Sequence, residues 1–184
     1  QQIFNFYQLD SIYYHLKNVF EFLKLEYYNH YKVFRKAEEF YDTVNDSTSL
    51  LLNNYYLYTF PGQFLITKIF RNLRMDTMKG MYDENEDLFA DFESDPNDVP
   101  NHYIYHAYRS LSCYFTGKYD EAARWINHLL NEVSLKKYPF ALLEIKLLLA
   151  LQYCLLRDYE LFYQLINSCQ RQIRLLGKDK CEHL

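Results

Sequence analysis

Glycine and proline are scarce in this sequence of 184 residues, which contains only 4 of each. Proteins built from short strands need many such residues at their turns, so this scarcity disfavours an all-β domain. Helices need far fewer turn residues, and apolar residues make up 49% of the chain, which is enough for a continuous core. We therefore expect a folded, all-α protein.

An excess of positive charge is also absent, because 20 Lys and Arg face 24 Asp and Glu, for a net charge of -4. Nucleic-acid-binding proteins normally carry a basic face that releases counterions. The densest basic cluster lies near the C-terminus, where cations complement a helix dipole; it consists of Arg171, Arg174, Lys178 and Lys180. We expect no nucleic-acid partner.

The longest apolar run, residues 138–156, is not free of charge. Glu144 and Lys146 interrupt it, together with the polar Gln152. Each charge would be costly at the middle of a bilayer, whereas a helix sandwiched between neighbours explains the same pattern. We expect no membrane association.

The 4 cysteines form no CxxC pair; they are Cys113, Cys154, Cys169 and Cys181. Their wide spacing and apolar neighbours indicate reduced thiols in a core, which predicts a cytoplasmic protein. Position 1 is Gln rather than Met, so we expect the chain to be part of a longer protein.

Motifs of common enzymes and cofactor sites are missing. We find no Gly-rich phosphate loop, GxSxG elbow or dinucleotide-binding motif. The run Asp83, Asn85, Asp87 resembles the start of a calcium-binding loop, but Leu88 and Ser94 occupy the positions that need Gly and a bidentate Glu. We expect no cofactor and no enzymatic activity, unless carboxylates or histidines from distant helices gather in a cleft.

His102 and His106 share one face of a predicted helix, and Cys113 lies two turns further along it. Zinc could use such a trio with a fourth ligand. However, no Glu stands between the two histidines as in HExxH, and the sequence marks no distant ligand. We expect ordinary packing or a polar surface here, and no metal site.

Apolar residues in the first half recur in steps of three and four, as in helices. They are Ile12, Leu16, Val19, Leu23, Tyr27, Tyr31, Phe34, Ala37, Tyr41 and Val44. Asn29 and His30 predict a turn between two helices. The polar run 45–47 predicts a second turn and N-cap before a helix over 50–60, which Pro61 and Gly62 should end. A further short amphipathic helix should follow over 64–73.

The acidic stretch 83–98 predicts a boundary between N-terminal helical hairpins (1–95) and a second array (96–184) that continues them. In the second array we expect a helix over 104–115 closed by Gly117, a second over 119–133, a third opened by Pro139 and a fourth capped by Asp158 and ended by Gly177.

The two turns of the second half match each other, since Gly117-Lys118-Tyr119-Asp120 corresponds to Arg157-Asp158-Tyr159-Glu160 at an offset of 40 residues (159 minus 119). A weaker echo at 34–39 lies 85 residues before Tyr119 (119 minus 34). Repeats of this length are typical of helical solenoids.

The stretch 117–122 resembles the turn and second-helix start of a tetratricopeptide repeat, with Gly closing the first helix and Ala122 permitting close approach. Ser110 agrees with the small residue of the first helix, whereas Arg109, Cys113 and Phe162 depart from the pattern. The resemblance implies antiparallel helix-turn-helix pairs, stacked as a short right-handed α-solenoid.

The resemblance also implies a non-catalytic scaffold that presents a groove to a protein or peptide partner. Aromatic side chains dominate binding hot spots, so the candidate partner-binding residues are Tyr103, Tyr105, Tyr114 and Trp125, with burial between helices as the ordinary alternative for each. The alternative function is a peptide or small-ligand sensor that regulates an effector domain outside this chain.

Overall fold

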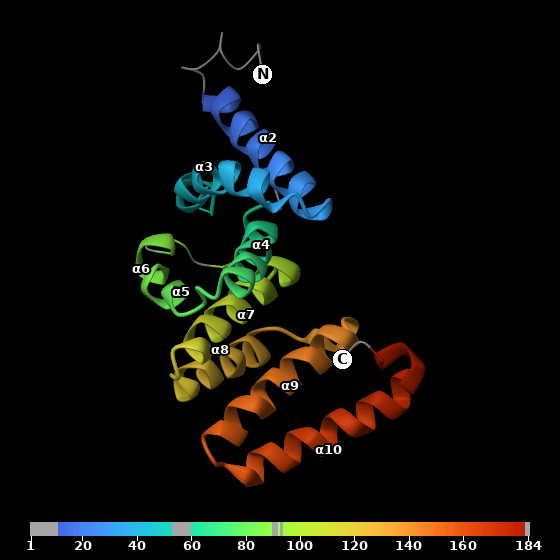
Figure 1. Cartoon of the computed structure of the whole chain (residues 1–184). Coiled ribbons are helices and arrows are strands. Elements are labelled where there is room, and N and C mark those ends of the chain that lie inside the picture. Colours follow the sequence, from blue (N-terminus) through green and yellow to red (C-terminus); the bar gives the residue numbers. More distant parts are fainter. Residues whose placement is uncertain (1–10, 53–59, 90–91, 93, 183–184) are drawn as a thin grey trace. The chain divides into compact units, whose positions relative to one another are not determined.

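The protein is all-helical, as predicted (Figure 1). The computed structural model describes the chain except residues 1–10, 53–59, 90–91, 93 and 183–184, and no strand occurs in the described part. The helices are α2 (Ser11–His30), α3 (Phe34–Leu52), α4 (Phe60–Met75), α5 (Gly80–Asp83), α6 (Asn85–Leu88), α7 (Val99–Phe115), α8 (Tyr119–Glu132), α9 (Pro139–Leu155) and α10 (Tyr159–Leu176), with short 3-10 turns at Leu135–Lys137 and Lys178–Cys181. Within these helices, none has both the length and the apolar character needed to cross a bilayer.

The chain forms two compact units that alternate along the sequence. Unit 1 contains residues up to Arg74 and the segment Glu84–Glu93, and unit 2 contains Met75–Asp83 and Ser94–Leu184. The chain therefore leaves unit 1, contributes a short segment to unit 2, returns, and then completes unit 2.

Unit 1 is built around the α2–α3 hairpin, whose helices pack along their length. Its core also includes Phe64 of α4, which is fully buried and packs edge-on against Phe22 with ring centroids 6.3 Å apart. The buried members of this core are Phe22, Leu25, Ala37, Tyr41, Val44 and Phe64. Aromatic pairs of this kind stabilise a core beyond the area that they bury.

A buried lysine ties the returning segment to unit 1. Lys68 of α4 is only 2% exposed. Its Nζ donates to Oδ1 of Asn45 at 2.9 Å and forms an ion pair with Glu84. Because a buried charge needs partners of this kind, Lys68 links α3, α4 and the segment that follows α5.

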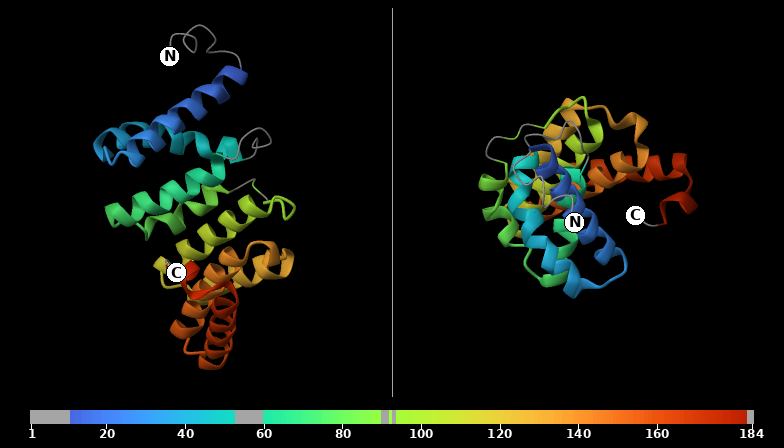
Figure 2. Two further views of the ribbon diagram at one scale, coloured as in Figure 1. Left: turned by 90° about the vertical axis from the view of Figure 1, so that its right-hand side faces the viewer. Right: turned by 90° about the horizontal axis from the view of Figure 1, so that it is seen from above.

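Unit 2 contains two antiparallel hairpins, α7–α8 and α9–α10, and α8 packs against α9. Helix α10 lies alongside α9 in Figure 1 and in both views of Figure 2. The core between α8 and α9 is formed by Ala123, Ile126, Leu129, Val133, Leu135, Ile145 and Leu149. Helix α9 is covered on its other side by α10, which explains why its sequence is apolar nearly all round.

Four of the longer helices, α2, α4, α7 and α9, are followed within two residues by a residue with left-handed backbone geometry. These residues are Lys32 (φ 57°), Asp76 (φ 56°), Gly117 (φ 78°) and Arg157 (φ 61°). At three of the turns this residue donates its N–H to the carbonyl three residues earlier, and the next residue donates to the carbonyl five residues earlier. The pairs are Lys32–Asn29 with Val33–Tyr28, Gly117–Tyr114 with Lys118–Cys113, and Arg157–Cys154 with Asp158–Tyr153, at 2.8 to 3.1 Å. These turns satisfy carbonyls that a helix end leaves unpaired.

Most predicted helix ends are confirmed. Helix α2 ends at His30, α9 begins at Pro139, and Gly177 has a positive φ at the end of α10. The carboxylate of Asp158 accepts the N–H of Leu161 at 3.1 Å, as expected of an N-cap.

The predicted turn at residues 45–47 is wrong, because α3 continues to Leu52. Asn45 uses its side chain for Lys68 rather than for a cap, and the adjacent Val44 is buried. Tertiary contacts thus override the local turn preference of the polar residues. Pro61 and Gly62 do not end a helix either. They lie in the first turn of α4, where the N–H that proline lacks has no helical partner. The predicted helix over 50–60 falls largely outside the described residues.

The turns at Gly117 and Arg157 allow a test of backbone strain. Replacing Arg157 by Gly should stabilise the protein by up to about 1 kcal/mol, because Gly adopts a positive φ without the clash of a Cβ. Replacing Gly117 by Ala should destabilise it by about 1 kcal/mol, since a Cβ there meets no neighbour and only the backbone conformation is penalised. Chemical denaturation of both variants measures these changes. Arg157→Ala is the control, because it keeps the Cβ, and an equal stabilisation by Ala would contradict the explanation.

Candidate functional site

Small side chains bring α7 and α8 close together. Ser110 and Ala122 are both fully buried, and Oγ of Ser110 donates to the carbonyl of Ala122 at 3.0 Å. Close helix contact of this kind needs small residues at the crossing. The hairpin is therefore tight enough for side chains near its open end to meet.

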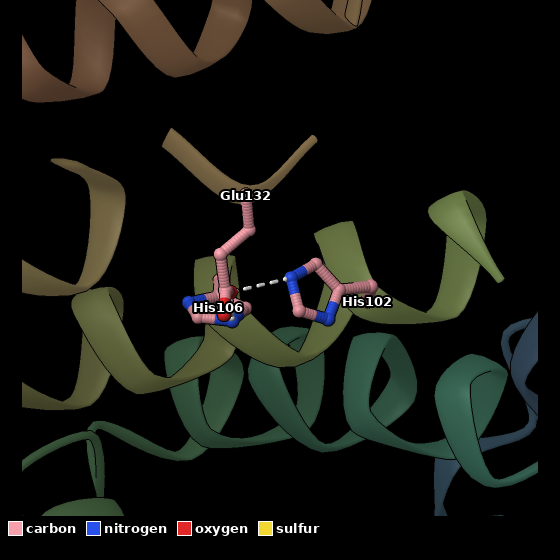
Figure 3. Close-up of side chains that lie close together, drawn as sticks. All are labelled: His102, His106 and Glu132. Atoms are coloured by element: carbon pink, nitrogen blue, oxygen red, sulfur yellow. Dashed lines mark hydrogen bonds and ion pairs between the residues drawn. The ribbon is translucent and has the colours of Figure 1, made fainter. Parts of the chain in front are cut away.

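Three histidines and a glutamate meet at that end, and we call them the histidine–glutamate cluster: His102, His106, His128 and Glu132. Figure 3 shows three of them, His102, His106 and Glu132. Oε2 of Glu132 lies 3.0 Å from Nε2 of His102, 3.6 Å from Nε2 of His106 and 2.9 Å from Nδ1 of His128. His102 and His106 are 2% exposed, whereas Glu132 and His128 reach the surface. One carboxylate oxygen is thus shared by three imidazole rings.

The tautomer of His106 follows from its second contact. Nδ1 of His106 lies 3.1 Å from the carbonyl oxygen of Trp125, which can only accept, so Nδ1 carries a proton. Burial, and next the nearby His102, lower the pKa of His106 to about 4. The ring is therefore neutral at pH 7, and the lone pair of Nε2 faces the Glu132 carboxylate.

His102 has fewer partners. Its Nε2 contacts Glu132, while its Nδ1 is buried with no hydrogen-bond partner in the part of the chain that the structure describes. A buried nitrogen of this kind costs free energy, so His102 is not an ordinary satisfied core histidine.

An aromatic wall adjoins the histidine–glutamate cluster. The ring of Trp125 lies 5.5 Å from that of His106 and 5.8 Å from that of Tyr105, and the guanidinium of Arg109 sits 4.3 Å above it. Cation–π contact and edge packing hold the indole in place. On its outer side lies a shallow hollow whose described lining residues all belong to α8: Glu121, Arg124, Trp125 and His128.

The four predicted partner-binding residues have different surroundings. Tyr105 is buried, at 8% exposure, and contacts Trp125. The hydroxyl of Tyr103 donates to Glu144 of α9 at 3.2 Å, and burial, then Glu144, raise its pKa. Tyr114 is partly buried and packs against Tyr119, with ring centroids 5.9 Å apart. The structure thus brings together Tyr105 and Trp125, and gives Tyr103 and Tyr114 other neighbours.

The sequence pattern did not indicate Glu132 and His128, and it suggested Cys113 as the partner of His102 and His106 instead. Cys113 is buried, and burial followed by the charge of Glu121 raises the pKa of its thiol to about 12. The carboxylate that joins the two histidines comes from α8. The sequence did contain a signal for this pairing. In a hairpin that turns at Gly117, residues equally far from the turn lie opposite each other, and Glu132 lies as far after Gly117 as His102 lies before it (132 minus 117 and 117 minus 102 are both 15).

Comparison with known proteins identifies no relative. No family model, no curated protein and no solved structure matches the chain. Function is therefore inferred from the residues of this chain.

The close approach of α7 and α8 can be tested by placing a larger side chain at the helix crossing. Ala122→Leu should destabilise the protein by about 1–3 kcal/mol, because the added atoms have no space between the helices. Asn131→Leu, on an exposed position of the same helix, should change stability by less than about 0.5 kcal/mol. Urea denaturation of the two variants gives the comparison, and equal stabilities would contradict the tight crossing.

Proposed function

We propose that this protein is a degenerate, tetratricopeptide-like array of helix pairs that serves as a non-catalytic scaffold for a protein partner. The helices would stack as a short right-handed solenoid. One observation supports the binding role, namely an exposed apolar stripe along α2. The recurring turns support the array.

The spacing of the left-handed turn residues supports a repeat. Successive intervals between Lys32, Asp76, Gly117 and Arg157 are 44, 41 and 40 residues (76 minus 32, 117 minus 76 and 157 minus 117). Helical repeats of about 40 residues are a known solenoid class. Three of the four residues are not glycine, so the backbone geometry recurs where the residue type does not.

The α2 stripe consists of five apolar side chains spaced by three or four residues, four of them in α2, at positions 16, 20, 23 and 27, and one directly after its end, at position 31. They are Leu16, Phe20, Leu23, Tyr27 and Tyr31, with exposures of 38, 36, 57, 58 and 61%. The core of unit 1 instead uses Phe22 and Leu25 of this helix. Helix α2 therefore has a second apolar face that is partly exposed, in which Phe20 also contacts the Lys24 ammonium at 4.6 Å, and an exposed apolar surface of this kind is typical of an interaction site.

The shape of the α2 stripe favours a helical segment as its partner. From Leu16 to Tyr27 the helix rises by roughly 16 Å at about 1.5 Å per residue, so the stripe is a narrow ridge along the helix axis. Ridges with this spacing pack into the groove of a second helix, and an amphipathic helix with apolar residues at the same intervals is complementary to it.

Trp125 is the second candidate contact, because it borders the hollow on α8. The buried Tyr105 supports Trp125 from behind rather than offering its own surface. The sensor alternative has less support at this hollow, since the four lining residues in the described part of the chain belong to one helix and do not enclose a ligand.

Disruption of the α2 stripe tests the proposed function. The variant Leu23→Lys with Tyr27→Lys should lose a partner protein that the unchanged chain retains stoichiometrically, because two charges would be buried in an apolar interface. The measurement is affinity capture combined with a photo-crosslinking side chain at position 27, which must attach to the same partner.

Leu175→Lys is the matched control, because Leu175 of α10 is 88% exposed and lies outside the stripe. It should keep the partner, and circular dichroism should be unchanged in both variants. Retention by the doubly charged variant would exclude the stripe, and loss by Trp125→Ala alone would move the interface to α8. If the unchanged chain retains no protein, the scaffold function is wrong.

A further inference from the structure

We infer that the histidine–glutamate cluster binds a divalent first-row transition-metal ion, with zinc as the probe, through Nε2 of His102, Nε2 of His106 and the carboxylate of Glu132. This inference concerns unit 2 alone and does not depend on the proposed scaffold function.

The three ligand atoms already lie at suitable separations. One atom from each of His102, His106 and Glu132 falls within 4.8 Å of the others. Zinc forms bonds of about 2.0–2.1 Å in a tetrahedral arrangement, which places ligand atoms about 3.3 Å apart. The distances from Oε2 of Glu132 to the two Nε2 atoms, 3.0 and 3.6 Å, lie on either side of that value.

The surroundings orient the ligands. The Trp125 carbonyl occupies Nδ1 of His106, so Nε2 is the nitrogen that remains for a metal. Metal-binding histidines usually donate their other ring N–H to a carbonyl or carboxylate in this way. The two histidines also stand one turn apart on α7, so a rigid helix fixes their separation (Figure 3).

The donor set selects the class of ion. Two imidazoles and a carboxylate suit zinc and neighbouring transition metals, whereas calcium and magnesium prefer oxygen ligands alone. The partial exposure of Glu132 leaves a path to solvent, and the exposed His128 already contacts its Oε2 from the adjacent turn of α8. The sequence favoured ordinary packing or a polar surface here, whereas the convergence of these side chains on one oxygen favours a metal site.

The position of the site gives the ion a structural effect. His102 lies in the first turns of α7 and Glu132 is the last residue of α8. A bound ion would join the open end of the hairpin, opposite the turn at Gly117, and would therefore raise the stability of the folded state.

Zinc titration of the full chain, followed by calorimetry and thermal unfolding, tests the inference. Trp125 is the only tryptophan and its ring lies 5.5 Å from that of His106, so its fluorescence should change as well. We expect one ion per chain and a higher unfolding temperature. Long-range proton–nitrogen spectra of the unchanged protein should show shifts at Nε2 of His102 and His106, independently of any variant.

Glu132→Gln and His106→Gln should each weaken zinc binding by about 10–100-fold or more. Glu132 is partly exposed, so its isosteric amide is expected to preserve the fold, which circular dichroism checks. His30→Gln removes an exposed histidine at the end of α2, and Cys154→Ser removes the least buried thiol. Both should leave zinc affinity unchanged, and millimolar magnesium should not compete.

Three results would overturn the inference. The first is the absence of stoichiometric zinc binding by the unchanged chain. The second is an equal affinity of the folded Glu132→Gln variant. The third is zinc-induced nitrogen shifts confined to histidines outside the histidine–glutamate cluster.

Discussion

The reversal of the chain at the α2–α3, α7–α8 and α9–α10 turns is the constraint on which the rest of the hairpin geometry depends. A residue with positive φ, followed by the same pair of backbone hydrogen bonds, turns the chain at Lys32, Gly117 and Arg157. Because the turn is short and its geometry fixed, it also fixes which residues of the second helix face which residues of the first. In the α7–α8 hairpin, this register sets His102 opposite Glu132.

Close packing then brings the side chains that face each other into contact. The contact between Ser110 and the Ala122 carbonyl allows the helices to approach, and the buried histidines fill the space toward the open end. The same face of α7 supplies Tyr105 and Arg109, which hold Trp125 from two sides. A polar cluster and an aromatic wall therefore share one rigid support, and each restricts the side-chain freedom of the other.

The sequence predicted the helices of unit 2 well because strong local signals coincide with their ends, namely Gly117, Pro139, Asp158 and Gly177. It failed where a distant contact decides the structure. Asn45 is a good turn residue, but Lys68 recruits its side chain into the fold. On α2 the apolar spacing was recognised, yet spacing alone does not distinguish the buried Phe22 from the exposed Leu23. Glu132 was missed for a similar reason, since it becomes a neighbour of His102 only after the hairpin is closed.

The interleaving of the two units has a consequence for the order of events during synthesis. Lys68 emerges from the ribosome before Glu84, and unit 1 includes residues up to Glu93. Until that segment has been made, the buried ammonium group has Asn45 but lacks its carboxylate partner, and an unpaired buried charge is strongly unfavourable. The burial of Lys68 in unit 1 is therefore completed only after Glu84 has been made, although the apolar core of α4 lies earlier in the chain.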